Sequence, residues 1–194
     1  MTLLSRRTWW TGIAALAVIT TLGCDEADAP LEGTYIARIG ETLIAVVVDD
    51  PNGLAVAYAC DGRDGVDEPL AVWFDGTLAD GAAELTGPDG SLSLTLADGV
   101  ASGELRLTGA APQAFDGPRS TADGVLLWAS TLPTETDLLG GWIFADDGTQ
   151  RGAVLKRSIG DTTSIALMTS RTTSLDFEGE DLTIKTLTTP LVVD

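Results

Sequence analysis

Short runs of alternating apolar and polar residues, separated by glycine-containing turns, make up most of the sequence after residue 31. Ser91–Leu96 places its leucines on one side of an extended strand, and Glu104–Thr108 follows the same alternation. Beyond residue 24, no window of ten or more residues carries an apolar stripe with helical spacing. The pattern predicts an all-β domain.

Asp-Gly pairs separate these runs and predict the turns between strands. Glycine tolerates the positive φ that both central positions of a type I′ hairpin turn require, and aspartate tolerates it better than most residues. The motif Thr-Leu-Ala-Asp-Gly occurs at 77–81 and again at 95–99, which predicts two hairpins of similar local structure. The pairs begin at Asp61, Asp64, Asp75, Asp80, Asp89, Asp98, Asp116, Asp123 and Asp147, and Asn52-Gly53 adds a similar turn.

The turns divide the chain into a series of short expected strands. These are 33–39, 42–49, 54–60, 70–75, 82–86, 91–97, 102–108, 125–129, 140–145, 151–157, 163–169 and 181–187. Strands joined by tight turns are usually neighbours, so we expect an antiparallel meander. Accumulated twist and exposed edges favour its closure into a β-barrel, with a two-sheet β-sandwich as the alternative. The polar stretch 131–137 is a candidate boundary between a main barrel and a C-terminal hairpin unit.

The first 24 residues follow a different pattern. Arg6 and Arg7 precede an uncharged stretch, 8–23, and Cys24 is followed at once by acidic residues. A basic start, a short apolar stretch and an abrupt polar switch are typical of a cleaved export signal. We therefore expect a signal peptide at 1–23, a tether at 24–31 and a single β domain at 32–194.

The end of this signal resembles the lipobox of bacterial lipoproteins. The resemblance lies in Leu22-Gly23-Cys24, while Thr21 stands where a large aliphatic residue is usual. It implies that Cys24 is acylated, with palmitate as a typical chain, and becomes the first residue of the mature protein. The alternative is an ordinary secretory signal cut nearby. Ser5–Trp10 also resembles a twin-arginine export motif, so the export route, Sec or twin-arginine, stays open.

Charge and composition limit the classes of function. The sequence has 11 basic and 29 acidic residues and no histidine, with a net charge of −18. This balance argues against nucleic acid as a partner and against adsorption on anionic lipid. Without histidine, Ser-His-Asp and Cys-His catalysis and the commonest zinc ligand are excluded. Lys156 and Lys185 are the only lysines, and neither lies in a Ser-x-x-Lys motif. We expect no cofactor and no enzymatic activity.

Two further sets of residues have a structural and a functional interpretation. Cys60 shares a strand face with the large residues of 54–60, which favours a buried core thiol over a reactive one. The alternation places Trp142 and Phe144 on one face, and Trp73 and Phe74 on opposite faces. Aromatic residues inside a barrel either fill it or line a pocket for one small ligand.

These observations predict a bacterial lipoprotein on the extracytoplasmic face of the cell membrane, acting as a non-catalytic binding or envelope interaction module. Its partners would be the membrane, through Cys24, and an unidentified protein or small molecule. The alternatives are a lipocalin-like carrier of a small apolar ligand and an acidic envelope hydrolase with paired carboxylates. Val56–Gly62 and Gly141–Gly152 resemble hairpin-rich secreted domains of high-GC bacteria, which implies no functional residue.

Overall fold

The computed structural model describes residues 31–63, 65, 69–131, 137–156, 162–166, 168 and 170–188, with the side chains of 162–165 left out. The expected signal peptide, Cys24 and nearly all of the tether lie outside the described residues, as does most of 131–137. Regular structure in the described part consists of antiparallel strands and one 3₁₀ turn, η1 (Asp50–Asn52). Within these residues, no helix is long and apolar enough to cross a membrane. The predicted all-β class is confirmed.

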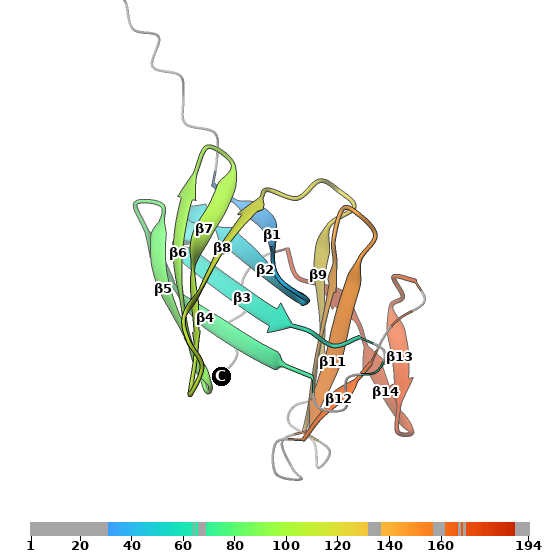
Figure 1. Cartoon of the computed structure of the whole chain (residues 1–194). Helices are drawn as coiled ribbons and strands as arrows, with labels where there is room; N and C mark the ends of the chain where they lie inside the picture. The colour runs from blue at the N-terminus through green and yellow to red at the C-terminus, as the bar shows by residue number, and fades with distance from the viewer. Residues whose placement is uncertain are drawn as a thin grey trace, which may run out of the picture.

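Eight strands form an antiparallel meander that closes almost completely into a barrel (Figure 1). Closure is made where β1 meets the end of β8, through an isolated bridge between Tyr35 and Arg119. The Ser120 amide also donates to the Thr34 carbonyl at 2.7 Å. The barrel strands are β1 (Gly33–Ile39), β2 (Thr42–Asp49), β3 (Leu54–Cys60), β4 (Ala71–Ala79), β5 (Ala82–Gly87), β6 (Gly90–Ala97), β7 (Val100–Leu107) and β8 (Gln113–Pro118).

The barrel interior is filled by side chains from all eight strands. Leu92, Leu94 and Leu96 of β6 point into it, as their alternation predicts, together with Tyr35 and Phe74. From β3 the interior receives only alanines, whereas Val56, Tyr58 and Cys60 point outward. The interior is therefore a packed core to which β3 contributes only small side chains.

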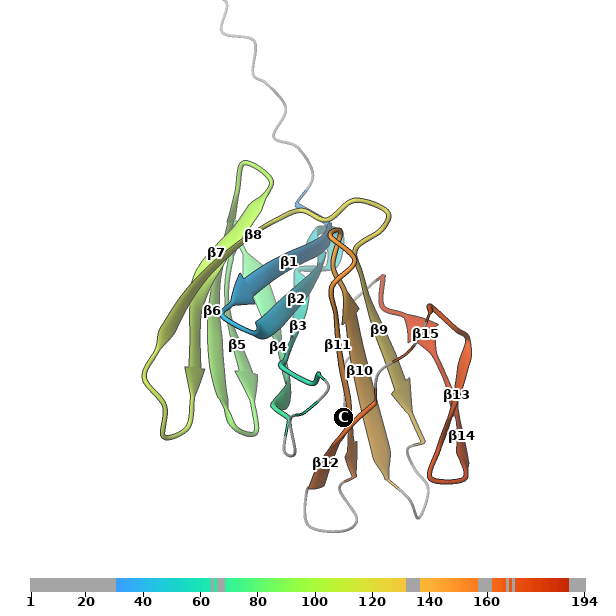
Figure 2. The ribbon, with the colours of Figure 1, turned by 45° about the vertical axis from the view of Figure 1, so that its right-hand side comes forward.

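A second, five-stranded sheet packs on the outward face of β2 and β3 (Figure 2). Leu43, Val47 and Tyr58 meet Leu126 and Ile143 in this contact, and all five are buried. The sheet has the order β12-β11-β10-β9-β15. Its strands are β9 (Val125–Ser130), β10 (Leu138–Phe144), β11 (Gln150–Lys156), β12 (Thr162–Ile165) and β15 (Lys185–Thr186).

A short hairpin covers the other face of the second sheet. Its strands are β13 (Ser174–Phe177) and β14 (Glu180–Thr183), which bury Leu182 against Trp142 and Leu127. The indole nitrogen of Trp142 donates to the carbonyl of Ala166. Three successive apolar layers therefore hold the fold together: the barrel interior, the contact between the sheets, and the contact under the hairpin.

Several strand predictions were wrong in detail. Asp75-Gly76 and Asp116-Gly117 were predicted to be turns, but they lie within β4 and β8. β8 and β13 were not predicted, and β4 continues to Ala79 instead of ending at Asp75. The turns at Asp80-Gly81 and Asp98-Gly99 are confirmed, since all four residues have positive φ.

Candidate functional site

The start of the folded domain is fixed at one end of the barrel. The hydroxyl of Tyr35 donates to the carbonyl of Leu31 at 2.9 Å. The Leu31 side chain packs on the barrel core, and its Cδ1 lies 3.4 Å from the position a Cβ would take at Gly81. Burial raises the pKa of the Tyr35 hydroxyl. The chain is thus fastened to the barrel at Leu31, the last residue of the predicted tether.

A pocket of about 360 Å³ lies beside this point, at the place where the barrel closes. Its lining comes from four separate stretches of chain: the start of β1, the end of β2, the residue after β8 and the segment after β15. The lining residues are Glu32, Gly33, Thr34, Val48, Asp49, Arg119 and Thr188.

Gly33 makes room for the one guanidinium in this lining. A Cβ at position 33 would lie 2.7 Å from Nε of Arg119. Gly33 also has a φ of +134°, a conformation that L side chains rarely adopt. The backbone of Arg119 is held by its amide, which donates to the carbonyl of Gly99 at 2.7 Å. The backbone conformation therefore favours glycine here, and the Arg119 guanidinium fills the space that a side chain would take.

Two acidic residues and one arginine line the pocket, so its charge is mixed but mostly negative. Glu32 and Asp49 line the pocket, and Asp49 accepts a hydrogen bond of 2.7 Å from the side chain of Asn52. The turns at Asp80 and Asp98 lie at the same end of the barrel (Figure 1). The pocket therefore offers donors and acceptors within one acidic surface.

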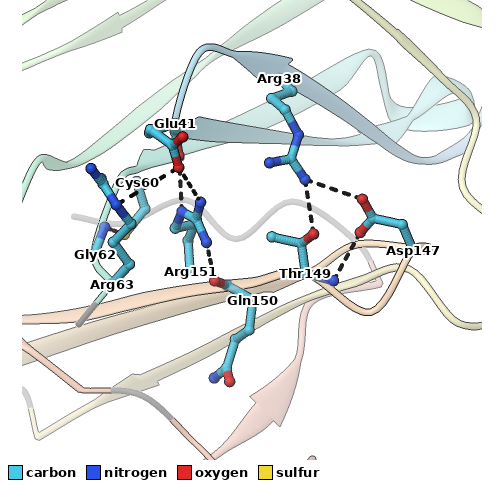
Figure 3. A network of polar contacts seen from close by, with 9 residues as sticks. All are labelled: Arg38, Glu41, Cys60, Gly62, Arg63, Asp147, Thr149, Gln150 and Arg151. Carbon is cyan, nitrogen blue, oxygen red and sulfur yellow. Dashed lines mark hydrogen bonds and ion pairs between the residues drawn. The ribbon is translucent and has the colours of Figure 1, made fainter.

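A second polar cluster ties the barrel to the second sheet and has the character of a structural clamp (Figure 3). Arg151 of β11 is only 8% exposed. Its guanidinium donates to the carboxylate and to the carbonyl of Glu41, both at 2.9 Å. Arg63 lies 3.7 Å from the same carboxylate, and Arg38 pairs with Asp147 at 3.2 Å. Each of the three guanidinium nitrogens of Arg151 donates a hydrogen bond within the protein. Because Arg151 lies in β11 and Glu41 between β1 and β2, the cluster joins the second sheet to the barrel.

Asp146 holds the connection between the two sheets. Its carboxylate accepts hydrogen bonds from the hydroxyl of Thr121 at 2.6 Å, the hydroxyl of Ser120 at 3.0 Å and the amide of Thr121 at 3.2 Å. These bonds, led by the Thr121 hydroxyl, lower the pKa of Asp146. The connection from β8 to β9 is therefore fastened to the β10–β11 turn.

The structure confirms the core interpretation of Cys60. The thiol is free and fully buried, and burial raises its pKa. It accepts a hydrogen bond of 3.3 Å from the amide of Gly62. The neighbouring Tyr58 hydroxyl is buried without a hydrogen-bond partner of normal geometry. Both groups belong to the contact between the two sheets.

Most of the other residues singled out in the sequence have a structural role where the structure describes them. In the described part of the chain, no three Asp, Glu or Cys side chains gather in a way that would hold a metal ion. Asp61, which begins one of the predicted Asp-Gly turns, accepts a hydrogen bond from the Leu70 amide at 2.7 Å. Phe74 and Trp142 are fully buried in two different cores. Cys24, the predicted lipidation site, lies outside the described residues.

Sequence reasoning missed the pocket at the barrel closure. Its residues are spread from Glu32 to Thr188 and meet only because β1 closes on β8. Comparisons with protein-family models, with curated proteins and with solved structures found no match for this chain.

Proposed function

We propose that the protein is a lipid-anchored module of the extracytoplasmic face of the cell membrane, which binds a partner without catalysing a reaction. The observation that carries the proposal is the hydrogen bond from Tyr35 to Leu31, which fastens the first described residue to the barrel. Leu31 follows Cys24 by seven residues. Such a stretch spans at most about 25 Å when fully extended. An acyl group on Cys24 would keep the barrel close to the bilayer.

The packing of the barrel supports a surface-binding role over a carrier role. Side chains of β1 to β8 fill the interior with buried apolar residues, among them Tyr35, Phe74 and Phe115. A ligand inside the barrel would have to displace this core. A partner that contacts the outer surface, the turns or the barrel ends needs no such displacement.

The missing catalytic groups support a non-catalytic role. The sequence contains no histidine and only two lysines, so the usual general bases for acyl transfer are lacking. Asp146 and Glu41, one carboxylate from each polar cluster, bind hydroxyls, amides and guanidinium groups of the protein itself.

Lipidation tests the anchoring part of the proposal. We expect the full chain, expressed with an alkyne-tagged palmitate, to be labelled and to fractionate with membranes. Cys24→Ala should be unlabelled and appear in the soluble extracytoplasmic fraction. Cys60→Ala is the matched control, because its thiol is buried, and it should stay labelled and membrane-bound. A Cys24→Ala variant that remains in the membrane fraction would overturn the anchor.

Crosslinking in intact cells tests the binding part. We expect an amine-independent photo-crosslinker placed at the exposed residue Ser102 or Glu178 to capture a defined protein at the membrane. Capture should weaken in the Cys24→Ala variant, since the released domain is no longer held beside membrane partners. If crosslinkers at all exposed positions gave no discrete product, this result would contradict the proposal that the protein is a protein-binding module.

A further inference from the structure

We propose that the line where β1 and β8 meet is a gate in the barrel wall. Pro118 keeps the two strands from pairing there, and the gate opens locally while the rest of the protein stays folded. This line, called the seam below, runs between Ile36–Ile39 of β1 and Gln113–Gly117 of β8. The inference goes beyond the proposed function and does not depend on an anchor at Cys24.

The seam is hydrogen-bonded at one end only. The bridge between Tyr35 and Arg119 and the bond from the Ser120 amide to the Thr34 carbonyl lie at that end. β1 and β8 both continue past the bridge but form no further ladder pair. By contrast, β1 is paired with β2 along its whole length. Among the eight barrel strands, whose residues are all described, the seam is the one junction between neighbours without a ladder.

Pro118 accounts for the place where the ladder stops. Bonded pairs alternate along an antiparallel ladder, so the pair that follows Thr34 and Ser120 is Ile36 and Pro118. One of the two bonds of that pair needs an amide N–H at position 118 to donate to the Ile36 carbonyl. Proline has no N–H, so this bond cannot form and the ladder is interrupted there.

Packing holds the two strands together where hydrogen bonds do not. A Cβ at Gly117 would lie 2.4 Å from the carbonyl oxygen of Ile36 and 2.7 Å from Cα of Ala37, so β8 lies directly against β1. Phe115 and Gly117 are the buried residues of β8, and Phe115 packs in the barrel interior with Ala37. A junction closed mainly by packing opens at a lower free energy than one that must also break a ladder.

β1 is the fixed side of the seam. Arg38 donates to Asp147 at 3.2 Å and to Thr149 at 2.9 Å, both in the β10–β11 turn of the second sheet (Figure 3). Ile36 packs in the contact between the two sheets. The second sheet and the β2 ladder therefore hold β1 in place, so opening of the seam moves β8.

β8 is the moving side of the seam and is fixed at one end. Directly after β8, the hydroxyls of Ser120 and Thr121 donate to Asp146 in the β10–β11 turn. At the other end, residues 108–114 are all exposed, and β8 itself is paired only with β7. β8 therefore pivots about its fixed end, and this movement exposes Phe115.

Opening changes the surface that the barrel presents to a partner. The outward face of β8 carries the exposed residues Ala114 and Asp116, whereas Phe115 on its inner face is buried among apolar side chains. Apolar groups reach that inner face only when the seam is open. The barrel thereby gains an apolar contact surface without unfolding.

Thiol labelling tests the gate. Cysteine is introduced as Ala37→Cys, beside the seam, or as Ala57→Cys, on the inner face of β3, and both alanines are buried. The full chain also carries Cys24→Ala and Cys60→Ala, so that each variant has one thiol. A bulky, neutral maleimide modifies the thiol, and its rate is measured in the absence and presence of low concentrations of urea. We expect Ala37→Cys to react about tenfold faster than Ala57→Cys and with little dependence on urea, because local opening exposes little surface.

Pro118→Ala tests the cause of the gap. Alanine restores an N–H opposite the Ile36 carbonyl, so labelling of Ala37→Cys should slow about tenfold, which corresponds to the gain of one hydrogen bond. Labelling of Ala57→Cys reports global unfolding and should change less. Pro112→Ala is the matched control, because Pro112 lies in the exposed β7–β8 connection, and it should leave both rates unchanged.

The outcomes decide between a gate and a uniformly closed barrel. Equal labelling rates at positions 37 and 57, with the same steep dependence on urea, would show that the barrel opens only by global unfolding and would overturn the gate. An unchanged rate for Ala37→Cys in the Pro118→Ala chain would also overturn it, because the proposal assigns the gap to Pro118. If a melting curve shows that Ala37→Cys does not fold, Phe115→Cys is compared with Phe74→Cys, since both phenylalanines are buried in the barrel interior.

Discussion

Gly141 of β10 lies directly against the ring of Tyr58 in β3, where the second sheet packs on the barrel. A Cβ at position 141 would come within 2.5 Å of Cζ of Tyr58 and 2.9 Å of Cζ2 of Trp73. The two ring centroids are 4.5 Å apart with their planes tilted by 31°, and both rings lie close to the position that a Cβ at residue 141 would take. The absence of a side chain at Gly141 sets how closely the second sheet approaches the barrel.

Gly141→Ala should therefore destabilise the contact between the sheets. The added methyl group has to displace two stacked rings in a packed core, which costs about 1–3 kcal/mol of unfolding free energy. Urea unfolding measures the loss. Ser102→Thr is the matched control, because it adds one methyl group on the exposed face of β7. Equal stability of the two variants would show that the sheets can move apart at no cost.

Tyr58→Phe should leave stability unchanged or raise it slightly. The hydroxyl is buried and makes no hydrogen bond of normal geometry, although the Cys60 thiol and the Ala153 backbone lie nearby. An unsatisfied buried polar group costs about 1–3 kcal/mol. Phenylalanine keeps the ring, including its stacking on Trp73, and removes only the hydroxyl. Thermal and urea unfolding at pH 7 check the result. A clear loss of stability would reveal a bonded hydroxyl and contradict the packing described for this residue.

The ion pair between Glu41 and Arg151 should stabilise the protein more than a surface pair does. Removing the carboxylate in Glu41→Ala leaves the guanidinium of Arg151, 8% exposed, with carbonyl acceptors only. We expect a loss of about 1–2 kcal/mol, because a nearly buried charge loses its partner. Glu104→Ala, which breaks the exposed pair with Arg106, is the control and should stay close to wild type. Similar losses in both variants would contradict a clamp at Arg151.

Sequence patterns predicted the barrel hairpins well because their turns are encoded locally. Asp80-Gly81 and Asp98-Gly99 have the positive φ that forces a tight reversal, whatever else surrounds them. Asp116-Gly117 has the same composition but lies inside β8, where pairing with β7 overrides the local preference. Pro118 ends that strand and pairs with Val100 at the edge of the sheet, a position that tolerates proline.

The second sheet had a sequence signal that the barrel prediction did not use. Leu43–Val48 and Leu54–Cys60 are apolar at nearly every position, whereas β5 and β6 alternate. Continuous apolar strands are buried on both faces, so these two runs predict a covering layer. The pocket carried no such signal. Glu32, Asp49 and Arg119 line one pocket because the barrel closes, and nothing in their local sequence predicts this.

Acid should weaken the link between the two sheets through Asp146. Hydrogen bonds from Thr121 and Ser120 lower the pKa of this carboxyl in the folded state. A depressed folded-state pKa contributes stability that is present above the unfolded value near pH 4 and is lost as the pH falls through the folded value. Asp146→Asn should therefore be less stable than wild type at pH 6, and the difference should shrink towards pH 3. Urea midpoints across this range test the prediction, and a constant difference would contradict it.

Alkali should destabilise the protein in steps set by Cys60 and the two buried tyrosines. Burial raises the folded-state pKa of Cys60, Tyr35 and Tyr58. Below the unfolded pKa of each group, both states keep the proton and stability is complete. Above it, the unfolded chain releases a proton that the folded chain retains, so unfolding becomes easier as the pH rises. The thiol contributes first, from about pH 8.5, and the tyrosines follow from about pH 10.

Urea midpoints measured under reducing conditions should fall between pH 8 and 10 in wild type and stay nearly level in Cys60→Ala. A parallel fall in both proteins would place the alkaline sensitivity elsewhere in the molecule.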